Sequence, residues 1–268
     1  MQKAIRAGFA ALLLMPACAG AQEGLAFSTA VDLNYKRLLQ TSVTSPTVPG
    51  GLTQVNEFTP TLWTLSVSPS LAYRGFFLAV AVERSLSEGT TAGQNSTLTS
   101  WLDRRYTRDE NSATLGYNFW RGFSAFAGYL HNSTKTKFTN TALTGSGVTS
   151  VGRSKFEEDA PYFGLGYSHR FGTGGTAAAS FALTSGDATL DQTTITAGSG
   201  ATTRTFSQGD LKGTSYGLSW SAPLTGSLYY RLGYKGTRYD FQAVDNLGIQ
   251  RKTKNDYDAL YLGVANYF

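Results

Sequence analysis

The chain has little of the chemistry on which most protein sites depend. Its 268 residues include one cysteine and two histidines, and charged residues make up only 15% of them. No apolar run approaches the roughly 20 residues that a transmembrane helix needs. No glycine-rich phosphate loop, metal-spaced histidine cluster or EF-hand loop occurs, so neither a cofactor nor a metal site is expected.

The one cysteine, Cys18, falls in a segment that we expect to be removed. Residues 1–21 have Lys3 and Arg6 at the head, an apolar centre, and Ala19-Gly20-Ala21 at the end. This is the pattern of a secretory signal peptide, although residues 14–18 also loosely resemble a lipoprotein signal. The mature chain, 22–268, would then contain no disulfide. Its 21 basic and 18 acidic residues are too balanced to indicate nucleic-acid binding.

What the chain does contain is a series of segments in which apolar and polar residues alternate. Alternation with period two is typical of a β-strand with a different environment on each face. Ten such segments can be marked, at 26–39, 61–73, 76–85, 104–118, 123–132, 160–171, 176–185, 211–222, 228–241 and 257–268.

Short and long connections alternate strictly between these segments. The short ones are glycine-containing turns after residues 73, 118, 171 and 222, and the long ones are 40–60, 86–103, 133–159, 186–210 and 242–256. Short periplasmic turns and long extracellular loops are the topology of an outer-membrane barrel. The sequence therefore predicts an all-β fold, a ten-stranded antiparallel transmembrane β-barrel in the cell outer membrane, as one domain over 22–268.

The alternation also assigns the two faces of several strands. In 61–73, Trp63, Leu65 and Val67 are expected to face lipid, and Ser66 and Ser68 the lumen. Aromatic residues gather beside the short turns, as in the interfacial belts of membrane barrels. The faces of 123–132 could not be assigned from the pattern.

The last segment, 257–268, ends on an aromatic residue. Tyr261, Gly263 and Phe268 have the spacing of the closing strand of Gram-negative outer-membrane β-barrels, although Asn266 stands where that strand has its penultimate aromatic. The segment thus resembles the assembly signal of this class, which includes small porin-like barrels. The resemblance implies contact with the barrel assembly machinery during insertion and with outer-membrane lipid afterwards.

The inward residues decide what such a lumen can do. The same alternation places a set of charged residues on the inward faces of the strands. We expect these residues to line a pore: Asp32, Lys36, Glu83, Arg108, Glu110, Arg231 and Lys235. Either these groups pair and plug the lumen, or they border a narrow water-filled path with a slight anion preference, four bases against three acids. Pairing of Arg231 and Lys235 with lumen acids would distinguish the plug from the pore.

Three functions follow, in order of preference. The first is a narrow passive channel for ions or small solutes. The second is a non-conducting surface protein that binds lipopolysaccharide or an external partner through its loops. Its expected lipopolysaccharide-binding residues are Arg104, Arg105, Arg251, Lys252 and Lys254, whose cations suit phosphate groups. Lys135, Lys137, Arg153 and Lys155 add further cations in the loop 133–159.

The third function is an envelope enzyme. His131 and Ser133 are two apart on one strand and resemble the His-x-Ser of outer-membrane lipid A 3-O-deacylases, in which Ser is the nucleophile and His the base. In that family a carboxylate lies on a neighbouring strand, whereas the next acids here, at 157–159, follow a predicted loop. The strand count also resembles omptin proteases, but these need an Asp-His couple and a facing Asp pair. We therefore do not expect an enzyme.

Overall fold

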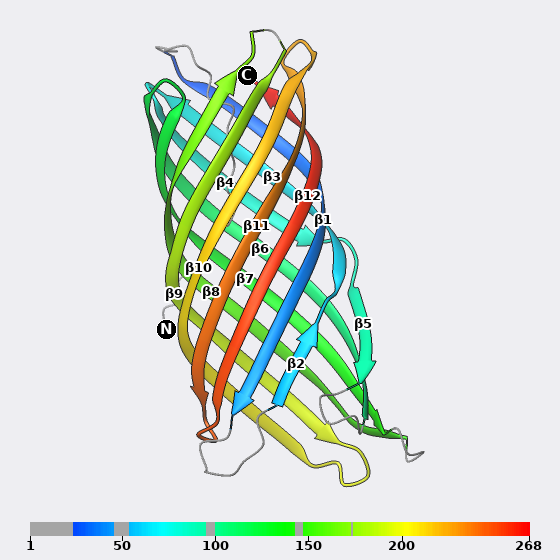
Figure 1. Cartoon of the computed structure of the whole chain (residues 1–268). Helices are drawn as coiled ribbons and strands as arrows, with labels where there is room; N and C mark the ends of the chain where they lie inside the picture. Colours follow the sequence, from blue (N-terminus) through cyan, green and yellow to red (C-terminus); the bar gives the residue numbers. More distant parts are fainter. Residues whose placement is uncertain (1–23, 46–53, 95–99, 143–146, 173) are drawn as a thin grey trace, which may run out of the picture.

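The computed structural model describes residues 24–45, 54–94, 100–142, 147–172 and 174–268, and all of its regular elements are β-strands (Figure 1). The predicted signal peptide lies outside the described residues. No helix within them is long and apolar enough to cross a membrane. The twelve strands of the described part are β1 (Ala26–Ser45), β2 (Gln54–Phe58), β3 (Thr61–Tyr73), β4 (Phe76–Ser85), β5 (Gly89–Gln94), β6 (Ser100–Trp120), β7 (Phe123–Ala142), β8 (Val148–Arg170), β9 (Thr176–Thr196), β10 (Thr202–Thr225), β11 (Leu228–Asp245) and β12 (Gln250–Tyr267).

These strands form one antiparallel sheet that closes on itself. The order is β12-β11-β10-β9-β8-β7-β6-β4-β3-β1-β2, β5 pairs with β6, and β12 also pairs with β1. The closing ladder runs from Ser28 opposite Tyr267 to Ser45 opposite Gln250. Closure satisfies the backbone groups that an open edge would leave unpaired, as a sheet in lipid requires.

The structure differs from the expected ten strands in where strands end. β2 and β5 lie within the predicted loops 40–60 and 86–103, and pair with β1 and β6. β7, β8, β9 and β10 continue far into the predicted loops 133–159 and 186–210. The sequence interpretation ended each strand where its apolar face ends. A backbone ladder does not need apolar side chains, so it continues where polar residues occupy the outer face.

Two of the tight connections are two-residue turns with a left-handed backbone. Arg74 and Gly75 have φ of 48° and 86°, and Arg121 and Gly122 have φ of 36° and 92°. Positive φ at both central residues matches the right-handed twist of the flanking strands. These turns lie at the same end of the barrel as the C-terminus, and the longer β-hairpins lie at the other (Figure 1).

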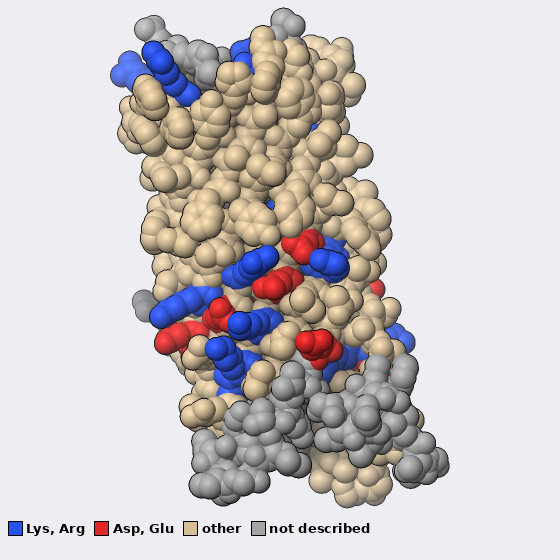
Figure 2. Space-filling model, viewed as in Figure 1, with Lys and Arg blue, Asp and Glu red and all other residues tan. Residues whose placement is uncertain are grey.

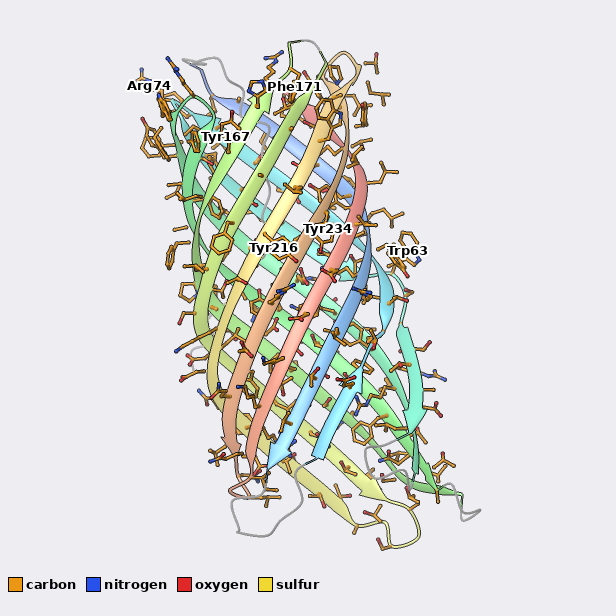
Figure 3. The ribbon with its side chains drawn as sticks, viewed as in Figure 1. Trp63, Arg74, Tyr167, Phe171, Tyr216 and Tyr234 are labelled. Atoms are coloured by element: carbon orange, nitrogen blue, oxygen red, sulfur yellow. The ribbon has the colours of Figure 1, made fainter. Side chains whose placement is uncertain are left out.

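The outer face carries an apolar band on the half of the barrel near the tight turns. Trp63, Leu65 and Val67 are exposed while Ser66 and Ser68 are buried, as the alternation predicted. Figure 3 shows Trp63 pointing away from the barrel wall. Exposed aromatic residues also stand beside the tight turns, namely Tyr73, Phe76, Phe119, Trp120, Phe123 and Phe171.

Large inward side chains pack over glycines of the neighbouring strands. A Cβ on Gly128 would lie 2.5 Å from the Tyr162 ring, and one on Gly164 would lie 2.5 Å from the Phe126 ring. The buried Phe126 and Leu130 also settle the face of β7 that the sequence left open. β7 and β8 thus each supply a ring and a glycine over which the ring of the other strand lies, so this part of the interior is packed.

Candidate functional site

The charged residues of the inward face come together inside the barrel. Each stands in the inward phase of its strand, so closure of the sheet turns all of them toward one another. They come from β1, β4, β6, β8 and β11, and the set is Asp32, Lys36, Glu83, Arg108, Glu110, Glu158, Arg231 and Lys235.

Glu110 is the centre of this network. Its Oε1 lies 2.8 Å from Lys36 Nζ and 2.7 Å from Arg108 Nε, and its Oε2 lies 3.6 Å from Lys235 Nζ. Lys36 Nζ also lies 2.6 Å from Glu83 Oε1. One carboxylate therefore faces three cations, an arrangement that is favourable only if all of them stay in place.

Arg108 extends the network across the lumen. Its Nη2 donates to Glu158 Oε2 at 2.6 Å, and its Nη1 donates to Thr134 Oγ1 at 2.8 Å and to the Tyr257 hydroxyl at 2.7 Å. Its guanidinium carbon also lies 3.9 Å from the centre of the Tyr257 ring. Asn132 donates to the same Glu158 oxygen at 2.8 Å. The guanidinium group thus ties β6 to β7, β8 and β12.

A separate pair joins Arg231 and Asp32. Arg231 Nη1 donates to Asp32 Oδ2 at 3.1 Å, although the two residues are 199 positions apart in the chain. The guanidinium carbon lies 5.7 Å from the centre of the Tyr261 ring. Both Arg231 and Lys235 are therefore paired with lumen acids, which was the condition that distinguishes a plug from a pore.

The network is balanced and largely shielded from water. Four carboxylates face four cations, so the slight anion preference expected from four bases and three acids disappears. Seven of the eight side chains are at most 9% exposed, and Lys235 is 25% exposed. A side chain that lined an open aqueous path would be accessible to water.

Glu158 is the member that sequence reasoning missed. Its side chain is fully buried, yet the prediction placed it in the loop 133–159. The signal was present, because Glu158 is in phase with the inward Gly164 and Gly166 of β8. Extending the alternation past the apolar face would have found it.

On the outer wall, His131 has a carboxylate partner that the sequence did not reveal. His131 and Asp159 stand opposite each other on β7 and β8, and their Nδ1 and Oδ1 atoms lie 2.8 Å apart. The expectation that a long loop separates them was wrong, because β7 continues to Ala142 and β8 begins at Val148, so the two residues face each other across paired strands. Ser133, on the same face, has a buried Oγ with no hydrogen-bond partner among the described residues.

The acidic pair at 109–110 does not form a protease-like carboxylate couple. Glu110 points inward and is buried, whereas Asp109 stands opposite Ser133 on the outward-facing register. Across the described residues, no three His, Cys, Asp or Glu side chains gather as a metal ion would need.

The five basic residues expected to bind lipopolysaccharide do not form one surface. Arg105, Lys252 and Lys254 are exposed. Arg104 instead stands over the Phe58 ring, with 5.0 Å between its guanidinium carbon and the ring centre. Arg251 donates to Asp245 Oδ2 at 3.0 Å within the β11–β12 hairpin. The prediction grouped Arg104 with Arg105, and Arg251 with Lys252 and Lys254, but alternation along β6 and β12 separates the directions of the side chains within each group.

On the face shown in Figure 2, charged side chains of both signs are interspersed on the outer wall beside the apolar band. Arg37 donates to Asp258 at 3.0 Å. Beyond the band on β9, Asp191 accepts from Arg204 at 3.0 and 2.5 Å. These hydrogen bonds favour the ionised carboxyl and hold the pKa of Asp191 below its ordinary value.

The fold can now be compared with known proteins. No protein-family model matches the sequence, and no curated protein matches it significantly. The chain is similar to the outer membrane protease OmpT from Escherichia coli, with a TM-score of 0.67 and 11% identity over 91% of this chain and 97% of that one. It is also similar to the translocator domain of the autotransporter NalP from Neisseria meningitidis, with a TM-score of 0.46 and 10% identity over 89% and 88%. The likeness to OmpT shows that the chain has the fold of a Gram-negative outer-membrane β-barrel.

Proposed function

We propose that this chain, which has the fold of a Gram-negative outer-membrane β-barrel, is an outer-membrane protein that does not conduct and that acts through its extracellular surface. The observation that carries the proposal is the paired, buried network around Glu110. A water-filled path through this level would have to break ion pairs that exclude water. The passive channel, which the sequence favoured, is therefore the weaker candidate.

Conductance of the refolded mature chain in planar bilayers tests the proposal. We expect no discrete openings from the wild-type protein, with folding established by heat-modifiable gel mobility. The same recording is made with Arg231→Ala and Lys235→Ala. Steady wild-type openings whose size or ion preference shifts in these variants would instead establish a charge-lined channel.

The proposal includes a finer architecture. β2 and β3 pair in succession with β1, and β4 and β5 pair in succession with β6. We propose that each succession acts as one interrupted strand, so that ten strands cross the membrane. Lipopolysaccharide or another external partner, and the barrel assembly machinery during insertion, are the partners that this placement favours.

A second candidate is lipid A deacylation, which the His131–Asp159 contact favours. The carboxylate that the deacylase resemblance requires is present, but Ser133 Oγ makes no hydrogen bond with any described residue that would activate it. We therefore expect no acyl loss when lipopolysaccharide is incubated with the protein and examined by mass spectrometry. Acyl release that disappears in Ser133→Ala and in His131→Ala would make the enzyme the better candidate.

A further inference from the structure

The outer wall of β7 and β8 places like charges directly opposite each other. Lys135 stands opposite Lys155, and Lys137 stands opposite Arg153. On the next strand, Arg105 stands opposite Lys137. All five side chains are exposed. Like charges directly across a ladder destabilise a sheet, so this arrangement has no rationale in the stability of the barrel.

Neighbouring carboxylates offset these charges only in part. Glu88 is shared, because its two oxygens lie 3.5 Å from Lys137 Nζ and 3.8 Å from Arg105 Nη1. Glu157 lies 2.7 Å from Lys155 Nζ. Among the described residues, neither Lys135 nor Arg153 lies within ion-pairing distance of a carboxylate.

The acid that faces this group from β9 is already engaged. Asp191 stands opposite Lys155 in the register, but both of its oxygens accept hydrogen bonds from Arg204. The group of Arg105, Lys135, Lys137, Arg153 and Lys155, called here the basic wall, therefore brings five cations together on one outward face, where Glu88 and Glu157 form ion pairs with three of them and Asp191 is shared with Arg204.

The position of the basic wall indicates which anion could meet it. On β7 the outward residues pass from the exposed Tyr129 to Lys135 within six positions. At about 3.3 Å per residue and a tilt of about 45°, Lys135 lies roughly 10–15 Å beyond the edge of the apolar band. The wall faces sideways, toward molecules standing beside the barrel in the outer leaflet, and not upward from the hairpin tips.

We propose that the basic wall binds the phosphorylated sugar core of a lipopolysaccharide molecule anchored beside the barrel. Phosphate oxygens accept charge-assisted hydrogen bonds from Lys and Arg and would relieve the repulsion across the ladder. The proposal rests on the outer-membrane placement argued above. Arg105 is one of the residues that the sequence predicted to bind lipopolysaccharide, and the other four are the cations that the sequence placed in the loop 133–159.

Binding of phosphorylated lipopolysaccharide to the full mature chain, refolded in detergent, tests the site. The patch variants are Lys135→Gln/Lys155→Gln and Lys137→Gln/Arg153→Gln, and the matched control is Lys212→Gln/Arg238→Gln, at exposed bases of β10 and β11. We expect each patch variant to bind at least about tenfold more weakly, about 1.4 kcal/mol. The control should change by less than about twofold, and dephosphorylated lipopolysaccharide should bind wild type as weakly as phosphorylated material binds the patch variants.

Several results would overturn the site. These are unchanged binding in both patch variants, loss confined to the Lys212/Arg238 control, or equal binding of dephosphorylated lipopolysaccharide. Effective competition by soluble core oligosaccharide at the same molar concentration would show that the ligand is not membrane-anchored. A merely structural role is excluded if thermal stability of Lys135→Gln/Lys155→Gln is equal to or above wild type while binding falls. Conductance is measured separately, so failure here is distinct from failure of the non-conducting proposal.

Discussion

At the scale of single residues, the chain concentrates its buried charge in a few side chains that depend on one another. Glu110 contacts three cations and Arg108 contacts two carboxylates. Removing one member leaves the charge of its partner buried and unpaired. This lowers the free energy of unfolding by far more than the intact pair contributes to it. The members therefore behave as a unit rather than as independent ion pairs.

We expect Glu110→Gln to lower the free energy of unfolding by about 3–5 kcal/mol, because it leaves buried cations unpaired. Urea unfolding followed by circular dichroism in detergent measures the change. Asp187→Asn, at an exposed acid of the outer wall, is the control and should change stability by less than about 0.5 kcal/mol. Equal effects of the two substitutions would mean that water reaches Glu110 and that the lumen is open.

At the scale of elements, the strands continue well beyond the apolar band. The two faces of β8 show why. Phe163 and Leu165 face outward in the apolar half of the barrel. Arg153 and Lys155 also face outward, but they lie nearer the start of β8, away from the tight turns. The period of two is continuous, and only the chemistry of the outer face changes. The sequence interpretation placed Glu158 and Asp159 in a loop, but following the alternation past the apolar residues would have placed both on the strand.

The β6–β7 turn gives an element-scale prediction. Gly122 has φ of 92°, and a Cβ there would lie 2.1 Å from the Ser168 carbonyl oxygen. Gly122→Ala should destabilise the barrel by about 1–3 kcal/mol through backbone strain and this contact. Gly172→Ala, at φ of 54° with open space around it, isolates the strain and should have a smaller effect. The thermal stabilities of the two variants are compared by heat-modifiable gel mobility. A larger loss of stability in Gly172→Ala than in Gly122→Ala would contradict the expected clash with the Ser168 carbonyl.

At the scale of the whole molecule, the barrel presents two unlike ends. Tight turns and the C-terminus lie at one end and extended hairpins at the other (Figure 1). A secreted chain that inserts from the periplasm would place the tight turns on that side. The basic wall then faces the outer leaflet, as the lipopolysaccharide proposal requires.

Cysteine labelling tests this orientation, because the only native cysteine is Cys18 in the predicted leader. Asn246→Cys, in the β11–β12 connection, should react with a membrane-impermeant maleimide in intact cells. Ser227→Cys, in the β10–β11 turn, should react only after the outer membrane is permeabilised. The reverse labelling pattern would mean that the tight turns face the outside of the cell. The proposal that the extended hairpins form the extracellular surface would then have no basis.

The sequence by itself determined the all-β class, the lipid-facing side of most strands and seven of the eight network residues. It could do so because period-two alternation is a local property that needs no knowledge of partners. Only the tertiary structure decided that Arg231 meets Asp32 and that His131 meets Asp159, since these contacts depend on register and closure across distant strands. It also decided where the strands end, because backbone pairing continues past the point where the outer face stops being apolar. The charge balance of the lumen followed from that extension, which brought Glu158 inside.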